Sequence, residues 1–170
     1  MILPYHSNFV HADEIIAHVG GLRGLGLDPL LEAKYIGFVT VACATVFEMA
    51  IKEILISFAD KKHKVLGSVI RSRCERMNGR IQIDNLKQDY ILPLGTKYKD
   101  RFDRKLAESA NRVLRMRHRD IRASYRNLLL WRHSFAHAAA TGANATWAEV
   151  VQAYEDGKDI ILCLHESLVR

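Results

Sequence analysis

Apolar residues recur at helical spacing along most of the chain, and clusters of turn-forming residues separate the runs. Asp28 followed by Pro29 is typical of an N-cap with proline at the first helical position, so a long helix is predicted over Leu30 to Phe58. The middle of this segment is apolar on most sides, which indicates a central, buried helix. A second helix is predicted over His63 to Met77, and Asn78-Gly79 ends it.

The pattern continues through the basic part of the chain. Asp84 to Tyr90 is predicted as a short helix or an irregular turn, and Asp100 to Arg117 as a basic helix. Asp120 is the predicted cap of a helix over 121–140. These elements complete a core over residues 28–140.

The ends of the chain are predicted to be helical as well. Thr146 and Glu149 form a capping box for a helix that runs to Tyr154, and Asp159 opens a last helix over Ile160 to Val169. The N-terminal segment, residues 1–27, is predicted as a short helix and a glycine-rich turn. We therefore predict one domain over residues 1–170, with an all-α fold of about five to seven bundled helices.

Composition indicates a single globular domain with reduced cysteines and no membrane-spanning segment. A chain of 170 residues that is 49% hydrophobic can build one ordinary core. Cys43, Cys74 and Cys163 form no CxxC pair and are expected to be reduced, mostly buried thiols. The longest uncharged stretch, Tyr35 to Phe47, has 13 residues and is too short to span a bilayer. Because no secretion signal is evident either, we expect a soluble, cytoplasmic protein with no membrane partner.

Positive charge is concentrated in one region of a chain whose net charge is +6. Twelve Lys or Arg residues and four acidic residues lie between Lys97 and Arg132. A solvated helix face is one explanation, but the bias in sign and the excess of arginine favour contact with phosphate groups. We predict nucleic-acid binding, and RNA contacts for Arg119, Arg122 and Arg126.

The segment Trp131 to Ala138 places an arginine and two histidines in an otherwise apolar helix. At helical spacing, His133 and His137 share one stripe, whereas Arg132 lies about 140° from His137, beside the core face. An imidazole exchanges protons near neutral pH, and a guanidinium can hold two phosphate oxygens. This pair suits cleavage of RNA by its own 2′-hydroxyl, a reaction that needs no metal. The two histidines could instead bind zinc, although no third ligand is evident.

The neighbourhood of this segment resembles a known family. LLLWRHSFAHA (residues 128–138) resembles the signature helix of HEPN domains, in which an arginine, a polar residue and three further residues precede a histidine. TVFEMAIKEIL, which contains Glu48, is similar to the HEPN helix with an acidic residue facing the motif. NLKQDYILPLGTKYKDRF (residues 85–102) is similar to the intervening segment of the RiboL-PSP-like branch. The resemblance covers residues 34–140.

The resemblance implies an all-α homodimer in which two motif helices form one composite site. It also implies an endoribonuclease without metal or cofactor, which leaves a 2′,3′-cyclic phosphate and a 5′-hydroxyl. By position, His137 is the general acid or base, Arg132 binds phosphate or has a structural role, and His133 is a polar helper. Glu48 is then the residue that orients Arg132.

The biological setting is also implied by the resemblance alone. Many relatives are toxins or act in defence against phage, so an antitoxin or a regulatory protein is an expected partner beside RNA. The alternative is a non-catalytic HEPN-like module that binds RNA or a protein through the same basic surface.

Overall fold

The chain folds into a bundle of helices. The structure, a computed structural model, describes residues 5–138 and 145–169, and the side chains of residues 137 and 138 lie outside this description. The described residues form seven α-helices and no strand, which confirms the predicted all-α class. The helices are α1 (His6–Arg23), α2 (Pro29–Lys62), α3 (Lys64–Glu75), α4 (Ile83–Asn85), α5 (Thr96–Arg117), α6 (Ile121–Ala138) and α7 (Trp147–Leu168). A π-helical turn (Leu86–Ile91) and a 3₁₀ turn (Leu92–Leu94) extend α4 towards α5.

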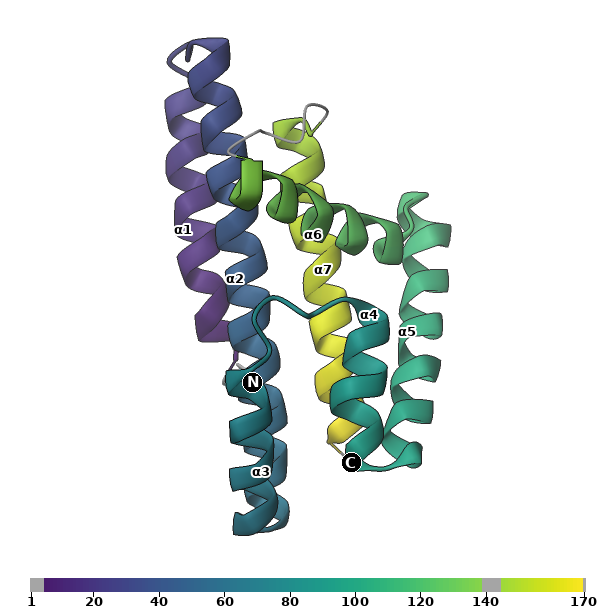
Figure 1. The fold of residues 1–170 in the computed structure, drawn as a ribbon. Helices are drawn as coiled ribbons and strands as arrows, with labels where there is room; N and C mark the ends of the chain where they lie inside the picture. The colour runs from purple at the N-terminus through teal and green to yellow at the C-terminus, as the bar shows by residue number, and fades with distance from the viewer. Residues whose placement is uncertain (1–4, 139–144, 170) are drawn as a thin grey trace.

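Helix α2 is the central element, as its apolar middle predicts. It begins at the predicted cap, where the side chain of Asp28 accepts hydrogen bonds from the N–H groups of Leu30 and Leu31, at 2.9 and 3.3 Å. It runs the length of the molecule, with α1 beside its first half and α3 beside its second half (Figure 1). Although α2 has 34 residues, neither it nor any other helix in the described ranges is long and apolar enough to cross a membrane.

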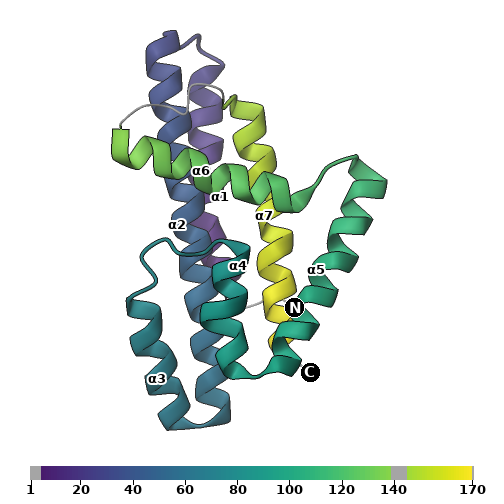
Figure 2. The ribbon, with the colours of Figure 1, turned by 45° about the vertical axis from the view of Figure 1, so that its right-hand side comes forward.

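Helix α6 crosses α2 and α7 instead of running along them (Figure 2). The crossing with α2 depends on Gly37, because a Cβ at this position would overlap the ring of Phe135 from α6. The close approach of the two backbones brings the motif helix against the part of α2 that carries Glu48.

Helix α7 corrects the prediction of two helices over 146–169. The capping box of Thr146 and Glu149 is present, but the helix then continues without interruption from Trp147 to Leu168. Gly157, in its middle, packs against the ring of Phe47, where a Cβ would clash. Asp159 caps nothing, and its carboxylate pairs with Arg112 of α5 at 3.6 Å.

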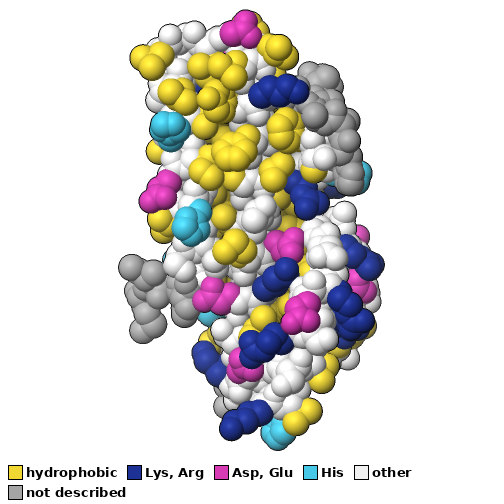
Figure 3. Space-filling view, turned by 60° about the vertical axis from the view of Figure 1, so that its left-hand side comes forward, with side chains coloured by type: hydrophobic (Ala, Val, Ile, Leu, Met, Phe, Trp, Pro, Cys, Tyr) yellow, Lys and Arg dark blue, Asp and Glu magenta, His cyan; other side chains and the backbone are white. Residues whose placement is uncertain are grey.

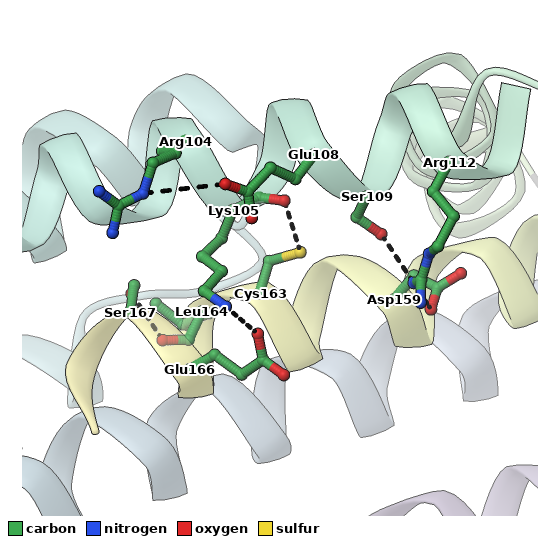
Figure 4. Close-up of polar contacts among 10 residues, drawn as sticks. All are labelled: Arg104, Lys105, Glu108, Ser109, Arg112, Asp159, Cys163, Leu164, Glu166 and Ser167. Carbon is green, nitrogen blue, oxygen red and sulfur yellow. Dashed lines mark hydrogen bonds and ion pairs between the residues drawn. The ribbon is translucent and has the colours of Figure 1, made fainter. Parts of the chain in front are cut away.

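Helix α5 packs along α7 on the side away from α2 (Figure 1). Figure 4 shows how its basic residues meet the acids of α7: Lys105 pairs with Glu166 at 3.0 Å, and Arg112 with Asp159. Within α5 itself, Lys99 pairs with Asp103 at 3.0 Å. Part of the positive charge between Lys97 and Arg132 is therefore used to join two helices.

The three cysteines are free and buried, as predicted. Burial raises the pKa of the Cys43 thiol to about 12 and the pKa values of the Cys74 and Cys163 thiols to about 11. At neutral pH these thiols are protonated core groups.

Candidate active site

The motif helix α6 begins where the sequence predicts. The carboxylate of Asp120 accepts a hydrogen bond from the N–H of Arg122 at 2.9 Å, and the helix starts at Ile121. Tyr125 and Leu128 of α6 are buried, and Trp131 is half-buried. The helix is described as far as Ala138, so the predicted residues 139 and 140 lie outside the described part of the chain.

A short turn between α3 and α4, residues 78–82, lies against both α2 and α6. Asn78 and Gly79 adopt positive φ angles of 42° and 77°, which reverse the chain after α3. The N–H of Gly79 donates a hydrogen bond to Oε2 of Glu48 at 2.8 Å. The hydroxyl of Tyr125 donates one to the carbonyl of Ile81, also at 2.8 Å. The 78–82 turn is thus fixed through two backbone atoms.

Arg132 packs directly on this turn. A Cβ at position 79 would lie 2.6 Å from Nη1 of Arg132, so the guanidinium occupies space that only glycine leaves open. Glu48 contacts the same glycine and also pairs with Lys52 at 2.6 Å. No ion pair joins Glu48 to Arg132 among the described side chains, and the two meet through Gly79. The prediction that Glu48 orients Arg132 remains a prediction, now with an indirect route.

A pocket of about 430 Å³ opens at this junction. Of the predicted site residues, Glu48, Arg126, Arg132 and His133 line it. Its lining includes apolar as well as polar side chains, and all five residues of the 78–82 turn contribute to it. The remaining lining residues are Ala44, Thr45, Asn78, Gly79, Arg80, Ile81, Gln82, Leu129 and Leu130.

His137 follows His133 by one turn of α6. Its backbone belongs to the helix, but its side chain lies outside the described residues, and so does the alternative zinc site that requires it. Among the described side chains, no group of three His, Cys, Asp or Glu residues is arranged to hold a metal ion.

Arg119 has a structural role that the sequence did not predict. Its Nη2 lies 2.7 Å from Oδ1 of Asp156, a fully buried residue of α7, and Ser124 donates a hydrogen bond to the other carboxylate oxygen at 2.7 Å. A buried carboxylate requires such partners. Arg119 therefore joins the start of α6 to α7, and its contact with RNA stays a prediction. Arg122 is exposed but does not line the pocket.

Sequence analysis missed the 78–82 turn as part of the site. The Asn-Gly pair signals the end of a helix, but nothing in its local pattern indicates contact with Arg132, which is more than fifty positions away. Tyr125 was likewise not recognised as a residue that fixes the turn.

The chemistry of the pocket favours an anionic ligand. Arg80, Arg126 and Arg132 face a single carboxylate, Glu48, and both oxygens of that carboxylate already have partners. Guanidinium groups bind phosphate oxygens in pairs, and the neighbouring His133 adds a group that can donate or accept a proton. The site can therefore hold a phosphate group next to an imidazole.

An all-α bundle with an Arg-x4-His motif on one helix and an acid facing it from another has the architecture of a HEPN domain. The family model described as RiboL-PSP-HEPN matches residues 8–170, and the chain belongs to this family. Membership indicates a nuclease-like or RNA-related role. Comparison with curated proteins found no match, and comparison with solved structures found none.

Proposed function

We propose that this protein is a metal-independent endoribonuclease. The observation that carries the proposal is the meeting of Arg132, His133 and Glu48 in one pocket, beside Arg126, on the helix that also bears His137. Arg132 precedes His137, the histidine that the family motif assigns to proton transfer, by five residues on the same helix, and His133 precedes it by four.

The proposed reaction uses the RNA's own 2′-hydroxyl. The 2′-oxygen attacks the adjacent phosphorus and loses its proton, while the bond from phosphorus to the 5′-oxygen breaks and that oxygen gains a proton. Arg132 stabilises the negative charge that builds on the phosphoryl oxygens. His137 exchanges one of the two protons, and the products are a 2′,3′-cyclic phosphate and a 5′-hydroxyl.

We further propose that the active form is a homodimer in which two motif helices contribute to one cleft. An exposed apolar patch supports this proposal. Figure 3 shows hydrophobic side chains gathered over the parts of α1 and α2 far from α3. The patch includes Leu31, Phe38 and Met49 of α2, which are 45%, 51% and 43% exposed. Apolar area of this kind marks interaction surfaces. The motif helix also exposes an apolar side chain, that of Leu130, at 57%.

The experiment that tests the nuclease is RNA cleavage in EDTA, with the product ends identified. Wild type is compared with His137→Ala and with His11→Ala, an exposed histidine of α1 that serves as the matched control. Loss of the acid–base group should lower the rate by about 10²–10⁴-fold, whereas the control should cleave like wild type. A substrate with 2′-deoxyribose at the cleaved position should resist both active proteins.

Two results would contradict the proposal. Cleavage by His137→Ala at the wild-type rate would remove this residue from the chemistry. Binding of RNA without cleavage by any variant would favour the non-catalytic binding module.

As a cellular role we propose a toxin or an anti-phage effector under the control of a partner protein. Expression of the wild type should arrest growth, and expression of His137→Ala should not. Equal growth with both would contradict this role, and RNA cleavage in vitro would be unaffected by that outcome.

A further inference from the structure

In the 78–82 turn, residues held through their backbone alternate with residues whose side chains are exposed. Gly79 and Ile81 are held through their backbone by Glu48 and Tyr125, and Ile81 is buried. Asn78, Arg80 and Gln82, the residues between and beside them, are exposed and line the pocket. The turn therefore presents three polar side chains from a backbone that is bonded to two helices.

We propose that the 78–82 turn recognises a nucleobase of the RNA, next to the phosphate that Arg132 contacts. The inference rests on RNA as the ligand of the proposed function. It adds a base-specific subsite, which neither the family motif nor the charge pattern assigns.

The side chains of the turn suit base recognition because they can donate hydrogen bonds in a fixed direction. The side-chain oxygen of Gln82 accepts a hydrogen bond from Asn85, which orients the amide and leaves its NH₂ group for a ligand. Arg80 forms an exposed ion pair with Asp89, at 3.4 Å. Such a pair contributes little and can exchange for a base acceptor. Amide and guanidinium groups distinguish bases by their acceptor and donor edges.

The pocket also provides the surroundings that an unstacked base requires. Its lining includes Ala44, Leu129 and Leu130, and Leu130, which is 57% exposed, offers an apolar surface to a base. Its volume of about 430 Å³ leaves room for a base and part of its sugar. Arg126 and Arg132 belong to α6 and can hold the phosphate. Because Arg132 packs on Gly79, a base next to that phosphate lies within reach of the turn. Proteins that bind RNA by sequence recognise such unstacked bases in single strands.

The test measures RNA binding, so that it does not depend on cleavage. Four five-nucleotide RNAs carry uridine at the outer positions and A, C, G or U at the centre, with 2′-O-methyl ribose throughout to prevent cleavage. Fluorescence anisotropy gives the Kd of each for wild type and for Gln82→Ala. Gln88→Ala is the matched control, because Gln88 is exposed and does not line the pocket.

Wild type should prefer one central base by about fivefold or more, the discrimination expected of one well-placed side-chain contact. Gln82→Ala should lose most of this preference, while Gln88→Ala keeps it. Tyr125→Phe should also weaken the preference, because the turn loses one of the two hydrogen bonds that hold its backbone. The Kd of this variant for the RNAs with disfavoured central bases should change little.

Equal binding of all four RNAs by the wild type, or a preference that Gln82→Ala leaves intact, would overturn the inference. Neither outcome depends on the cleavage assay in EDTA. Failure of the base subsite and failure of the proposed nuclease are therefore separate results.

Discussion

Glu48 of α2 and Arg132 of α6 both contact Gly79, the carboxylate through the glycine N–H and the guanidinium through the space where a Cβ would be. The glycine thus connects the acid that the family pattern places opposite the motif with the arginine of the motif itself. The positive φ of 77° adds a second reason for glycine at this position. The site therefore depends on the backbone N–H of Gly79, a group that lies outside the Arg-x4-His motif.

Replacement of Gly79 by alanine should damage the site more than the fold. The added Cβ would displace the guanidinium of Arg132, and a displaced phosphate-binding group should cost about 100-fold in cleavage rate. The left-handed backbone should cost about 1–2 kcal/mol of unfolding free energy. Gly21→Ala is the control, because a Cβ there meets no atom within 4 Å. Cleavage by Gly79→Ala at the wild-type rate would show that Arg132 does not require this contact.

Arg119 and Arg122 should behave in opposite ways when each is changed to alanine. Arg119→Ala leaves the buried carboxylate of Asp156 without its ion pair, and should lower the free energy of unfolding in urea by about 3 kcal/mol. Arg122→Ala should change stability by less than about 0.5 kcal/mol. The loss of a phosphate contact at Arg122 should reduce the slope of log Kd against log salt concentration by about one for RNA binding. A stable Arg119→Ala protein would contradict the structural role of this residue.

The apolar patch on α2 should be needed for the proposed dimer. Phe38→Glu places a charge where a second copy would bury it, so sedimentation should show a shift from dimer to monomer. Val65→Glu is the matched control, since Val65 is 64% exposed on α3, away from the patch. Identical sedimentation of the two variants would place the dimer contact elsewhere. Loss of cleavage together with loss of the dimer would indicate a composite site.

The ion pairs of Asp103 on α5 should make the stability of the fold depend on pH in the acid range. Partial burial raises the pKa of this carboxyl, whereas hydrogen bonds from Lys87 and Lys99 lower it. The lowering is the larger effect, so the pKa lies below the ordinary value of 3.8. A folded-state pKa below the unfolded value stabilises the fold above pH 3.8, and this stability is lost as the pH falls through the folded pKa.

The variant Asp103→Asn should therefore be less stable than wild type at pH 7, by at most about 1 kcal/mol because the group is partly exposed. The difference in Tm should shrink as the pH falls below 3.8. Asp100→Asn, an exposed neighbour on the same helix, should show no such trend. A constant difference in Tm from pH 7 to pH 2 would mean that the ion pairs of Asp103 do not contribute.

The sequence predicts those parts of the fold that depend on local chemistry. Asp28 with Pro29 and Thr146 with Glu149 mark helix starts through hydrogen bonds within a few residues, and both starts are found. The break predicted near Gly157 is absent, because the glycine serves a contact with Phe47, which is distant in the sequence. Local preference for a break is overcome by packing against α2.

Some residues of the candidate site could also be predicted from the sequence, whereas others depend on contacts between distant parts of the chain. The resemblance to HEPN domains predicts Arg132, His133 and Glu48 as site residues, and the fold brings them to one pocket. The ion pair of Arg119 could not be predicted, because its partner, Asp156, lies 37 residues further along the chain. The role of Gly79 could not be predicted either, because it depends on how α6 crosses α2.

The 78–82 turn is held through the N–H of Gly79 and the carbonyl of Ile81, groups that do not depend on side-chain identity. Positions 80 and 82 are therefore free to vary in evolution while the backbone keeps its shape. Under the proposed base subsite, a change at either position would alter which RNA is preferred and leave the motif helix untouched. One scaffold would then acquire new RNA targets by single substitutions.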